Sequence, residues 1–154
     1  MTAVSARIIP MKRTHVQACD EITLISEPWK TLHEHIDFVP YIGLKEAHVC
    51  IINDRLIGFV VFTPTPVFAR GGYLRAIGVA PLMRGRGIGK LLMTFAERAT
   101  AEHCSNLFLC VSSFNTDAQD FYNRLGYTRV GTLPDLIIQH ASEYIYWKRL
   151  AAKP

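Results

Sequence analysis

Residues 79–93 of this chain read VAPLMRGRGIGKLLM, and the seven residues from Arg84 to Lys90 include three glycines and three cations. An apolar run precedes this segment, and an apolar stripe at helical spacing follows it. A helix start leaves about four backbone N–H groups without intrahelical partners, and glycines before it let a ligand approach the backbone. The segment therefore predicts a strand, a glycine turn and a helix whose first amides bind a phosphate or pyrophosphate.

Two common phosphate-binding motifs do not fit this segment. The P-loop requires Ser or Thr after its lysine, but Lys90 is followed by Leu91. The dinucleotide fingerprint requires a glycine five residues after its first one, and the residues found there are Lys90, counted from Gly85, and Leu92, counted from Gly87. A glycine cluster that serves only a tight strand-to-helix turn therefore stays open as an alternative.

The composition predicts one compact domain over residues 1–154, with 49% hydrophobic and 19% charged residues. The net charge of +4 suits an anionic small molecule, and the spread of Lys and Arg along the chain gives no support for a nucleic-acid partner. The four cysteines lie far apart, without C-x-x-C spacing, which indicates a reducing compartment rather than a disulfide framework or a zinc site. Because we find no signal peptide and no apolar run of about 20 residues, we expect a cytoplasmic protein without a membrane partner. We also expect a monomer or homodimer, and no bound metal.

Hydrophobic periodicity predicts strands and helices mixed along the chain, as in an α/β (α+β) fold. Strands are expected over residues 6–12, 47–54, 56–64, 71–80, 106–113, 127–133 and 142–150. Helices are expected from a cap at Thr14 to about Glu27, over residues 26–38, from Ile88 to Ala99, and from Ala118 to Leu125 with Gly126 as the stop. Asn53 and Asp54 predict a hairpin turn, and residues 71–113 predict a right-handed crossover between parallel strands.

The glycine segment resembles the acetyl-CoA signature of the GNAT family of N-acetyltransferases. The pattern V-x-P-x-x-R-G-x-G-x-G is matched at Val79, Pro81, Arg84, Gly85, Gly87 and Gly89. The resemblance extends over roughly residues 6–150 and is specific between 73 and 127. It implies a strongly twisted mixed sheet of six or seven strands flanked by about four helices. It also implies acetyl-CoA as cosubstrate, with the pantetheine arm paired to the backbone of Ile77 and Val79. The amides implied for the pyrophosphate are those of Arg84, Gly85, Arg86, Gly87, Ile88, Gly89 and Lys90.

A second segment, SSFNTDAQDFYNRLGY at residues 112–127, resembles the family pattern N-x-x-A-x-x-F-Y-x-x-x-G-F/Y. The resemblance implies that Asn115 contacts the pantetheine arm and that Tyr122 is a general acid for the leaving thiolate. A phenol has a pKa near 10 and a thiol one near 8.5, so this proton transfer has a modest cost. The residues alone leave two alternatives open, namely that Asn115 is a helix N-cap and that Tyr122 belongs to the core.

The group that removes the proton of the attacking amine is less evident. Many members of the family place a glutamate on the strand that corresponds to residues 73–79, but this segment reads YLRAIGV. Tyr73 is the candidate here, because the chain resembles N-terminal acetyltransferases that have a tyrosine at this position. The alternative is that Tyr73 is only a structural tyrosine at the edge of a strand. His48, His33 and His35 are further candidates, with surface or capping roles as alternatives.

By analogy with the family, the acceptor site lies between the first two helices and the last hairpin. Trp29 would form an apolar wall there, and Glu27 or Glu34 would pair with an ammonium group. Tyr144, Tyr146 and Trp147 would line this site or fill the core. Residues 1–46 contain six acids and five bases, a balance that does not favour a polyamine acceptor.

The sequence thus predicts an acetyl-CoA-dependent N-acetyltransferase. The expected acceptor is a primary amine, on a small molecule or at a peptide or protein N-terminus, which attacks directly in a ternary complex because no cysteine has an activating context. Two alternatives stay open. One is a non-catalytic acyl-CoA-binding module, and the other is a nucleic-acid binder that uses Arg84, Arg86 and Lys90.

Overall fold

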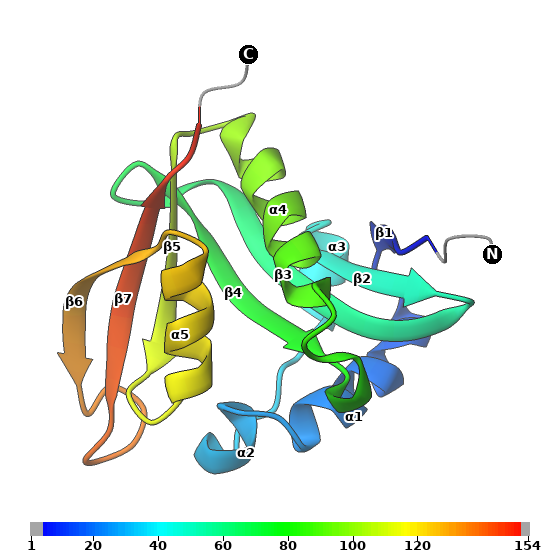
Figure 1. Ribbon diagram of the computed structural model, residues 1–154, viewed down its shortest axis with the longest axis horizontal. Helices are drawn as coiled ribbons and strands as arrows, with labels where there is room; N and C mark the ends of the chain where they lie inside the picture. The colour runs from blue at the N-terminus through cyan, green and yellow to red at the C-terminus, as the bar shows by residue number, and fades with distance from the viewer. Residues whose placement is uncertain (1–4, 152–154) are drawn as a thin grey trace. The chain divides into compact units, whose positions relative to one another are not determined.

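The protein has an open, mixed sheet of seven strands in a computed structural model that describes residues 5–151 (Figure 1). The strands are β1 (Arg7–Pro10), β2 (Ala47–Ile52), β3 (Arg55–Phe68), β4 (Gly71–Val79), β5 (Asn106–Ser112), β6 (Thr128–Pro134) and β7 (Ser142–Arg149). The α-helices found in this part of the chain are α1 (Val16–Leu24), α2 (Trp29–Leu32), α3 (Val39–Gly43), α4 (Ile88–Ala101) and α5 (Thr116–Arg124). The strand order is β1-β2-β3-β4-β5-β7-β6. This confirms the predicted fold class, with five helices instead of about four.

The pairing of the strands is antiparallel for β1–β2, β2–β3, β5–β7 and β6–β7 and parallel for β4–β5. The parallel pair confirms that the strands on either side of the crossover predicted for residues 71–113 are parallel, and the handedness of the crossover stays a prediction. The chain divides into two compact units, one up to Phe62 together with Ala76–Ala96, and one of Thr63–Arg75 together with the chain from Glu97 onward. The expected single domain over residues 1–154 extends beyond the described residues and stays a prediction.

In the first unit, helices cover both faces of β2 and β3 (Figure 1). The ring of Phe59 contacts Trp29 of α2 at 5.9 Å and Phe38 at 5.1 Å between centroids. On the other face, His48 packs between Phe62 and Phe95 of α4. The core on the α1–α3 side contains Met11, Cys19, Ile22, Trp29, Phe38, Ala47, Val49, Ile51, Phe59, Val61 and Ala76.

In the second unit, α5 lies over β5 and β7 (Figure 1). Strand β5 is buried on both faces, as its continuous apolar run predicts. The second unit also contains a group of hydrogen-bonded polar side chains. The Glu97 carboxylate accepts hydrogen bonds from the Tyr127 hydroxyl at 2.9 Å and from Lys148 Nζ at 3.0 Å. Gly126, at φ +90°, ends α5 as predicted.

The N-terminal elements differ from the prediction. Thr14 lies in a short 3-10 turn at Arg13–His15, and α1 begins only at Val16, so Thr14 is not the helix cap. The predicted second helix is limited to α2, because the next residue, His33, adopts a left-handed conformation at φ 53°. Helix α3 was not predicted.

The hairpins agree with the prediction at one turn and differ at the other. Asn53 and Asp54 both have positive φ, as a type I′ turn requires. Strand β3, by contrast, does not end at Pro64 as expected but continues through Pro66 to Phe68. The last five residues of β3 are largely exposed, a place where prolines are tolerated in strands.

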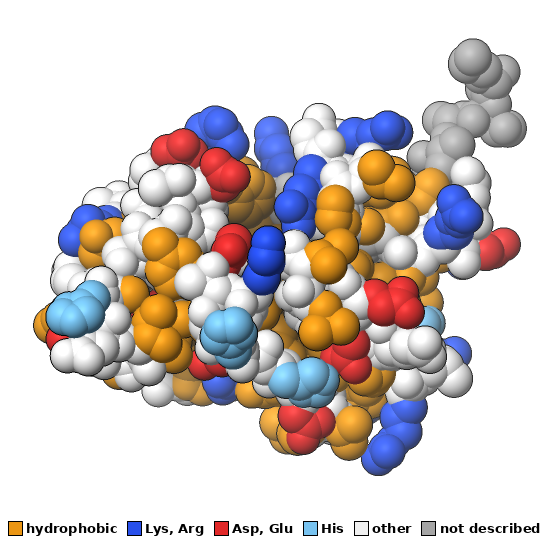
Figure 2. All heavy atoms as spheres, turned by 90° about the horizontal axis from the view of Figure 1, so that it is seen from below, with side chains coloured by type: hydrophobic (Ala, Val, Ile, Leu, Met, Phe, Trp, Pro, Cys, Tyr) orange, Lys and Arg blue, Asp and Glu red, His pale blue; other side chains and the backbone are white. Residues whose placement is uncertain are grey.

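One face of the protein mixes side chains of all kinds. Acidic, basic and histidine side chains lie scattered among hydrophobic ones on the face that Figure 2 shows. None of the helices described between residues 5 and 151 has the length and apolar character that crossing a membrane requires.

Gly78 provides a stability prediction, because the ring of Phe59 occupies the space beside it. A Cβ at Gly78 would lie 2.4 Å from Phe59 Cε1, closer than the two atoms can approach. Gly78→Ala should therefore lower the free energy of unfolding by about 1–3 kcal/mol, as overpacked cores do. Urea denaturation measures this loss. Gly43→Ala is the control, because a Cβ there meets no atom within 4 Å, and equal stability of the two variants would contradict the explanation.

His48 provides a pH prediction. Burial lowers the pKa of its imidazole, and Nδ1 is buried without a hydrogen-bond partner in the described structure. The unfolded chain therefore takes up a proton near pH 6.5 and the folded protein only at lower pH. Stability should fall as the pH drops below about 6.5 and should level off below the folded-state pKa.

Thermal unfolding at pH 7.5 and 5.5 tests this prediction on wild type and His48→Phe. The variant keeps an aromatic ring between Phe62 and Phe95 but cannot be protonated, so it should lose less stability on acidification. Burial also lowers the pKa of His15, which is present in both proteins and cancels in the comparison. An equal loss in both proteins would show that His48 does not contribute.

Candidate active site

The loop before α4 has the conformation that the glycine segment predicts. Gly85 and Gly87 adopt φ values of +73° and +83°, which side-chain-bearing residues rarely adopt. A Cβ on either glycine would meet no atom within 4 Å. Internal packing thus does not require glycine at these positions, whereas the backbone conformation does, and the space beside the loop is open to a ligand.

The same loop starts α4. The carbonyl of Gly87 accepts a hydrogen bond from Leu91 N at 3.0 Å. The amides of Ile88, Gly89 and Lys90 belong to the first turn, where α-helices have no carbonyl acceptor to offer. The positive end of the helix dipole adds to their attraction for anions.

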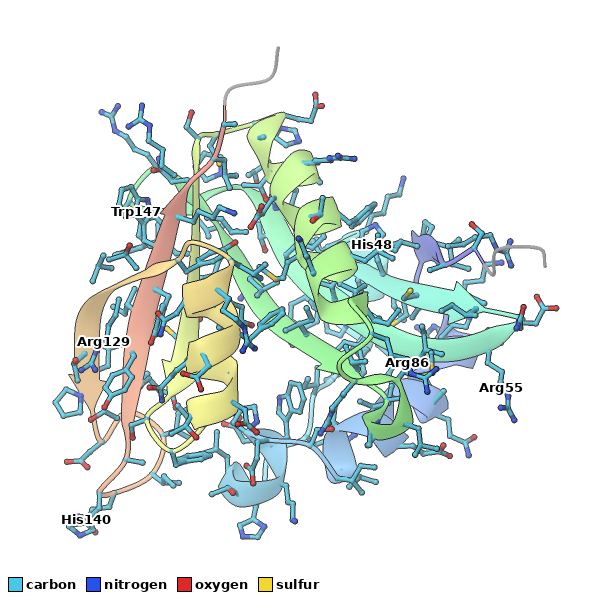
Figure 3. The ribbon with its side chains drawn as sticks, viewed as in Figure 1. His48, Arg55, Arg86, Arg129, His140 and Trp147 are labelled. Carbon is cyan, nitrogen blue, oxygen red and sulfur yellow. The ribbon has the colours of Figure 1, made fainter. Side chains whose placement is uncertain are left out.

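The cations of the loop differ in their surroundings. The Arg84 guanidinium donates from Nη2 to Ser26 Oγ at 2.8 Å and from Nε to the Val79 carbonyl at 3.2 Å. Arg84 therefore holds the loop against the residues that follow α1. Arg86 and Lys90 are exposed, and Figure 3 shows Arg86 on the loop that precedes α4.

Ile77 and Val79 are the residues predicted to pair with a pantetheine arm. Both are half-buried and alternate with the buried Ala76 and Gly78. The registered pairing of β4 with β5 involves Gly72–Leu74, so Ile77 and Val79 lie beyond it.

Tyr122 lies in an aromatic cluster of the second unit. Its ring is 5.7 Å from that of Tyr127 and 6.4 Å from that of Tyr146, between centroids, and the residue is 6% exposed. Burial raises the pKa of the Tyr122 phenol above its ordinary value. The hydroxyl therefore keeps its proton at neutral pH, as a proton donor must.

Asn115 is the N-cap of α5. Its Oδ1 accepts a hydrogen bond from Ala118 N at 3.3 Å, which is the capping role that the sequence left open. The cap uses the side-chain oxygen, so the amide nitrogen is the group with which Asn115 would contact a ligand.

Tyr73 has polar neighbours that the sequence analysis missed. Its hydroxyl donates a hydrogen bond to the Cys110 thiol, and burial together with this bond raises the pKa of Tyr73. The negative charge of Glu143 raises it further, and the guanidinium of Arg75, 5.6 Å from the ring centroid, opposes this. Glu143 in turn accepts a hydrogen bond from Ser112 Oγ at 2.5 Å. One feature of the sequence could have pointed to Glu143, because it is the single acidic residue in the predicted strand SEYIYWKRL.

The three residues predicted at the acceptor site have local partners in the first unit. Glu27 accepts hydrogen bonds from Thr31, at 2.7 Å from its hydroxyl and 3.3 Å from its amide. Trp29 packs in the core against Phe59, and Glu34 is exposed. An ammonium group would reach the carboxylates of Glu27 and Glu34 at the surface, whereas Trp29 is largely buried.

The further candidates also have defined places. His48 lies in the aromatic stack described above. His35 pairs with Asp20 at 3.3 Å, and His33 is the residue that ends α2. Tyr146 is buried in the cluster with Tyr122. The Trp147 indole, labelled in Figure 3, donates to Asn106 Oδ1 at 2.9 Å.

Comparisons with known proteins point in one direction. A family model described as the acetyltransferase (GNAT) family matches residues 16–127. A stretch of 78 residues is 40% identical to the thialysine N-epsilon-acetyltransferase of Bos taurus. That match covers 50% of this chain and 44% of the bovine protein, so it spans less than half of the relative.

Two solved structures are similar over nearly the whole chain. Ard1 from Thermoplasma volcanium has a TM-score of 0.81 at 19% identity, covering 96% of this chain and 99% of that one. Arabidopsis thaliana Naa50, in complex with the bisubstrate analogue CoA-Ac-MVNAL, has a TM-score of 0.77 at 20% identity, covering 96% and 100%. At these identities the likeness concerns the fold.

Proposed function

Because the chain belongs to the GNAT acetyltransferase family, we propose that it moves the acetyl group of acetyl-CoA to a primary amine. The observation that carries the proposal is the loop at Gly85 and Gly87, where positive φ angles and open space precede the first turn of α4. Such a loop binds a diphosphate through backbone amides. The exposed side chains of Arg86 and Lys90 add positive charge to the same place.

The cofactor would extend from this loop along β4. In this proposal the pantetheine arm pairs with the backbone of Ile77 and Val79, and Asn115 contacts the arm through its amide nitrogen. Arg84 acts as a positioning residue, because its guanidinium contacts Val79 and Ser26. Its backbone amide would still belong to the pyrophosphate site.

Tyr122 would then be the general acid of the transfer. The amine attacks the thioester carbonyl, a tetrahedral intermediate forms, and the C–S bond breaks as the thiolate takes the Tyr122 proton. Because burial raises the pKa of this phenol, the transfer costs more than it would from a phenol in water, and the proton moves only as the thiolate leaves. Tyr73 would contact the acceptor amine, and its raised pKa makes it a hydrogen-bonding group rather than an anionic base.

The acceptor would be a primary amine of a small molecule or of a peptide N-terminus. The names of the similar proteins support both kinds, since one is a thialysine acetyltransferase and another binds a CoA–peptide conjugate. Glu27, Trp29 and Glu34 would contribute to the acceptor side. We place the protein in the cytoplasm, as the sequence predicts.

Calorimetry with acetyl-CoA, followed by a mass-spectrometric screen with small amines and short peptides, tests the proposal. We expect acetyl-CoA to bind and at least one primary amine to gain an acetyl group while free thiol is released. Binding without any acetylated amine would favour an acyl-CoA-binding module. Salt-sensitive duplex binding that coenzyme A does not compete away would favour a nucleic-acid binder.

A further inference from the structure

A buried carboxylate lies on the same face of the sheet as Tyr73. Tyr73 is registered with Phe108 of the parallel strand β5, and side chains two residues apart on a strand share a face. Cys110 and Ser112 therefore point to the same side as Tyr73. Glu143 of β7 is registered opposite Ser112 and shares this side. Strand register alone thus brings these polar groups together within the second unit.

The contacts within this cluster are specific. Glu143 is 6% exposed, and its carboxylate accepts the Ser112 hydroxyl at 2.5 Å. Its charge acts on both Tyr73 and Cys110, so it lies within electrostatic reach of the two. The cation beside Tyr73 is Arg75 of the same strand. The cluster therefore offers a carboxylate with a serine hydroxyl on one of its oxygens and a tyrosine hydroxyl within electrostatic reach.

The proposed acetyl transfer lacks a proton acceptor. The strand segment at residues 73–79 has no carboxylate, and Tyr73 itself keeps its proton at neutral pH. The cluster supplies a carboxylate that lies on the same face as Tyr73 and within its electrostatic reach, on the second strand beyond β4 in the sheet order. A neutral amine is the nucleophile, so an acceptor that arrives as an ammonium ion must lose a proton before it attacks.

We propose that Glu143 binds the ammonium group of the acceptor and takes its proton, with the Tyr73 hydroxyl as a second contact. This inference rests on the proposed acetyl transfer. One N–H proton passes to Glu143, and the nitrogen lone pair then forms the C–N bond. The C–S bond breaks as the thiolate takes the Tyr122 proton, and a second N–H proton leaves to solvent. Tyr122 then regains a proton from water and Glu143 gives the proton it took to solvent, so one acetyl group moves and one net proton is released.

Glu143→Gln tests this role, because it keeps the shape and an acceptor for Ser112 but cannot take a proton. Each primary amine that the wild type acetylates rapidly in the mass-spectrometric screen is compared, at pH 8, with its β,β-difluoro analogue. The analogue is less basic and largely neutral at that pH. For the basic amine, kcat/KM should fall about 100-fold, the usual contribution of a general base. For the fluorinated analogue it should fall less than about fivefold, because little proton remains to be removed.

The outcomes separate this inference from the proposed function. Equal losses for both amines, or no loss, would overturn the role of Glu143, while a wild type that acetylates no amine would overturn the proposed function. Calorimetry should show acetyl-CoA affinity within about twofold of wild type, since Glu143 is not assigned to cofactor binding. If Glu143→Gln does not fold, Glu143→Asp gives the same comparison, with a smaller loss that is again larger for the basic amine.

Discussion

Replacing Tyr122 with phenylalanine should lower kcat about 1,000-fold while acetyl-CoA affinity stays within about twofold of wild type. The ring would keep its contacts with Tyr127 and Tyr146, so the fold and the cofactor site should persist. What the variant loses is the proton that the departing thiolate needs. General acids contribute about 100- to 10,000-fold to such steps, and expulsion of a thiolate from a buried site lies within this range.

Tyr146→Phe is the matched control, since it removes a hydroxyl from the same aromatic cluster. Its kcat should stay within about threefold of wild type, because Tyr146 has no assigned role in proton transfer. Thiol release under saturating acetyl-CoA and amine measures both variants. A Tyr122→Phe enzyme as fast as wild type would remove Tyr122 from the mechanism and favour the core role that the sequence left open.

The elements around the glycine loop could be predicted because their signals are local. The apolar spacing of Ile88, Leu92, Phe95 and Ala99 belongs to α4, and the turn at Asn53 and Asp54 needs only residues that tolerate positive φ. The short helices were harder. Helix α3 has five residues, too few for a periodic pattern to stand out in the sequence.

The candidate site could be predicted only in part, because its two kinds of residues leave different traces in a sequence. The loop amides follow from glycines at fixed spacing, whereas the cluster around Tyr73 joins side chains from three strands. Cys110 lies 37 positions and Glu143 lies 70 positions after Tyr73, and only the register of β4, β5 and β7 brings them to one face. The contact of Arg84 with Ser26 could not be predicted for the same reason, because the two residues are 58 positions apart in the sequence.

Gly87→Val should weaken acetyl-CoA binding about 1,000-fold. Valine does not adopt the φ of +83° found at this position without strain, so the loop must move and the amides that follow it must turn away. Two charge-assisted hydrogen bonds to the diphosphate, each contributing about 2 kcal/mol, would then be lost. About 4 kcal/mol corresponds to this change in the dissociation constant, which calorimetry with acetyl-CoA measures.

Gly126→Val controls for strain, because Gly126 also has a positive φ of +90° but ends α5, away from the loop sequence. It should lower the thermal stability as Gly87→Val does and leave acetyl-CoA affinity nearly unchanged. S-acetylpantetheine, which lacks the diphosphate, provides a second comparison. Its kcat/KM should be the same for wild type and Gly87→Val, since the thioester end does not use the loop amides. A large loss with this truncated substrate would mean that the substitution damages the active site as a whole, and the loop would no longer be the diphosphate site.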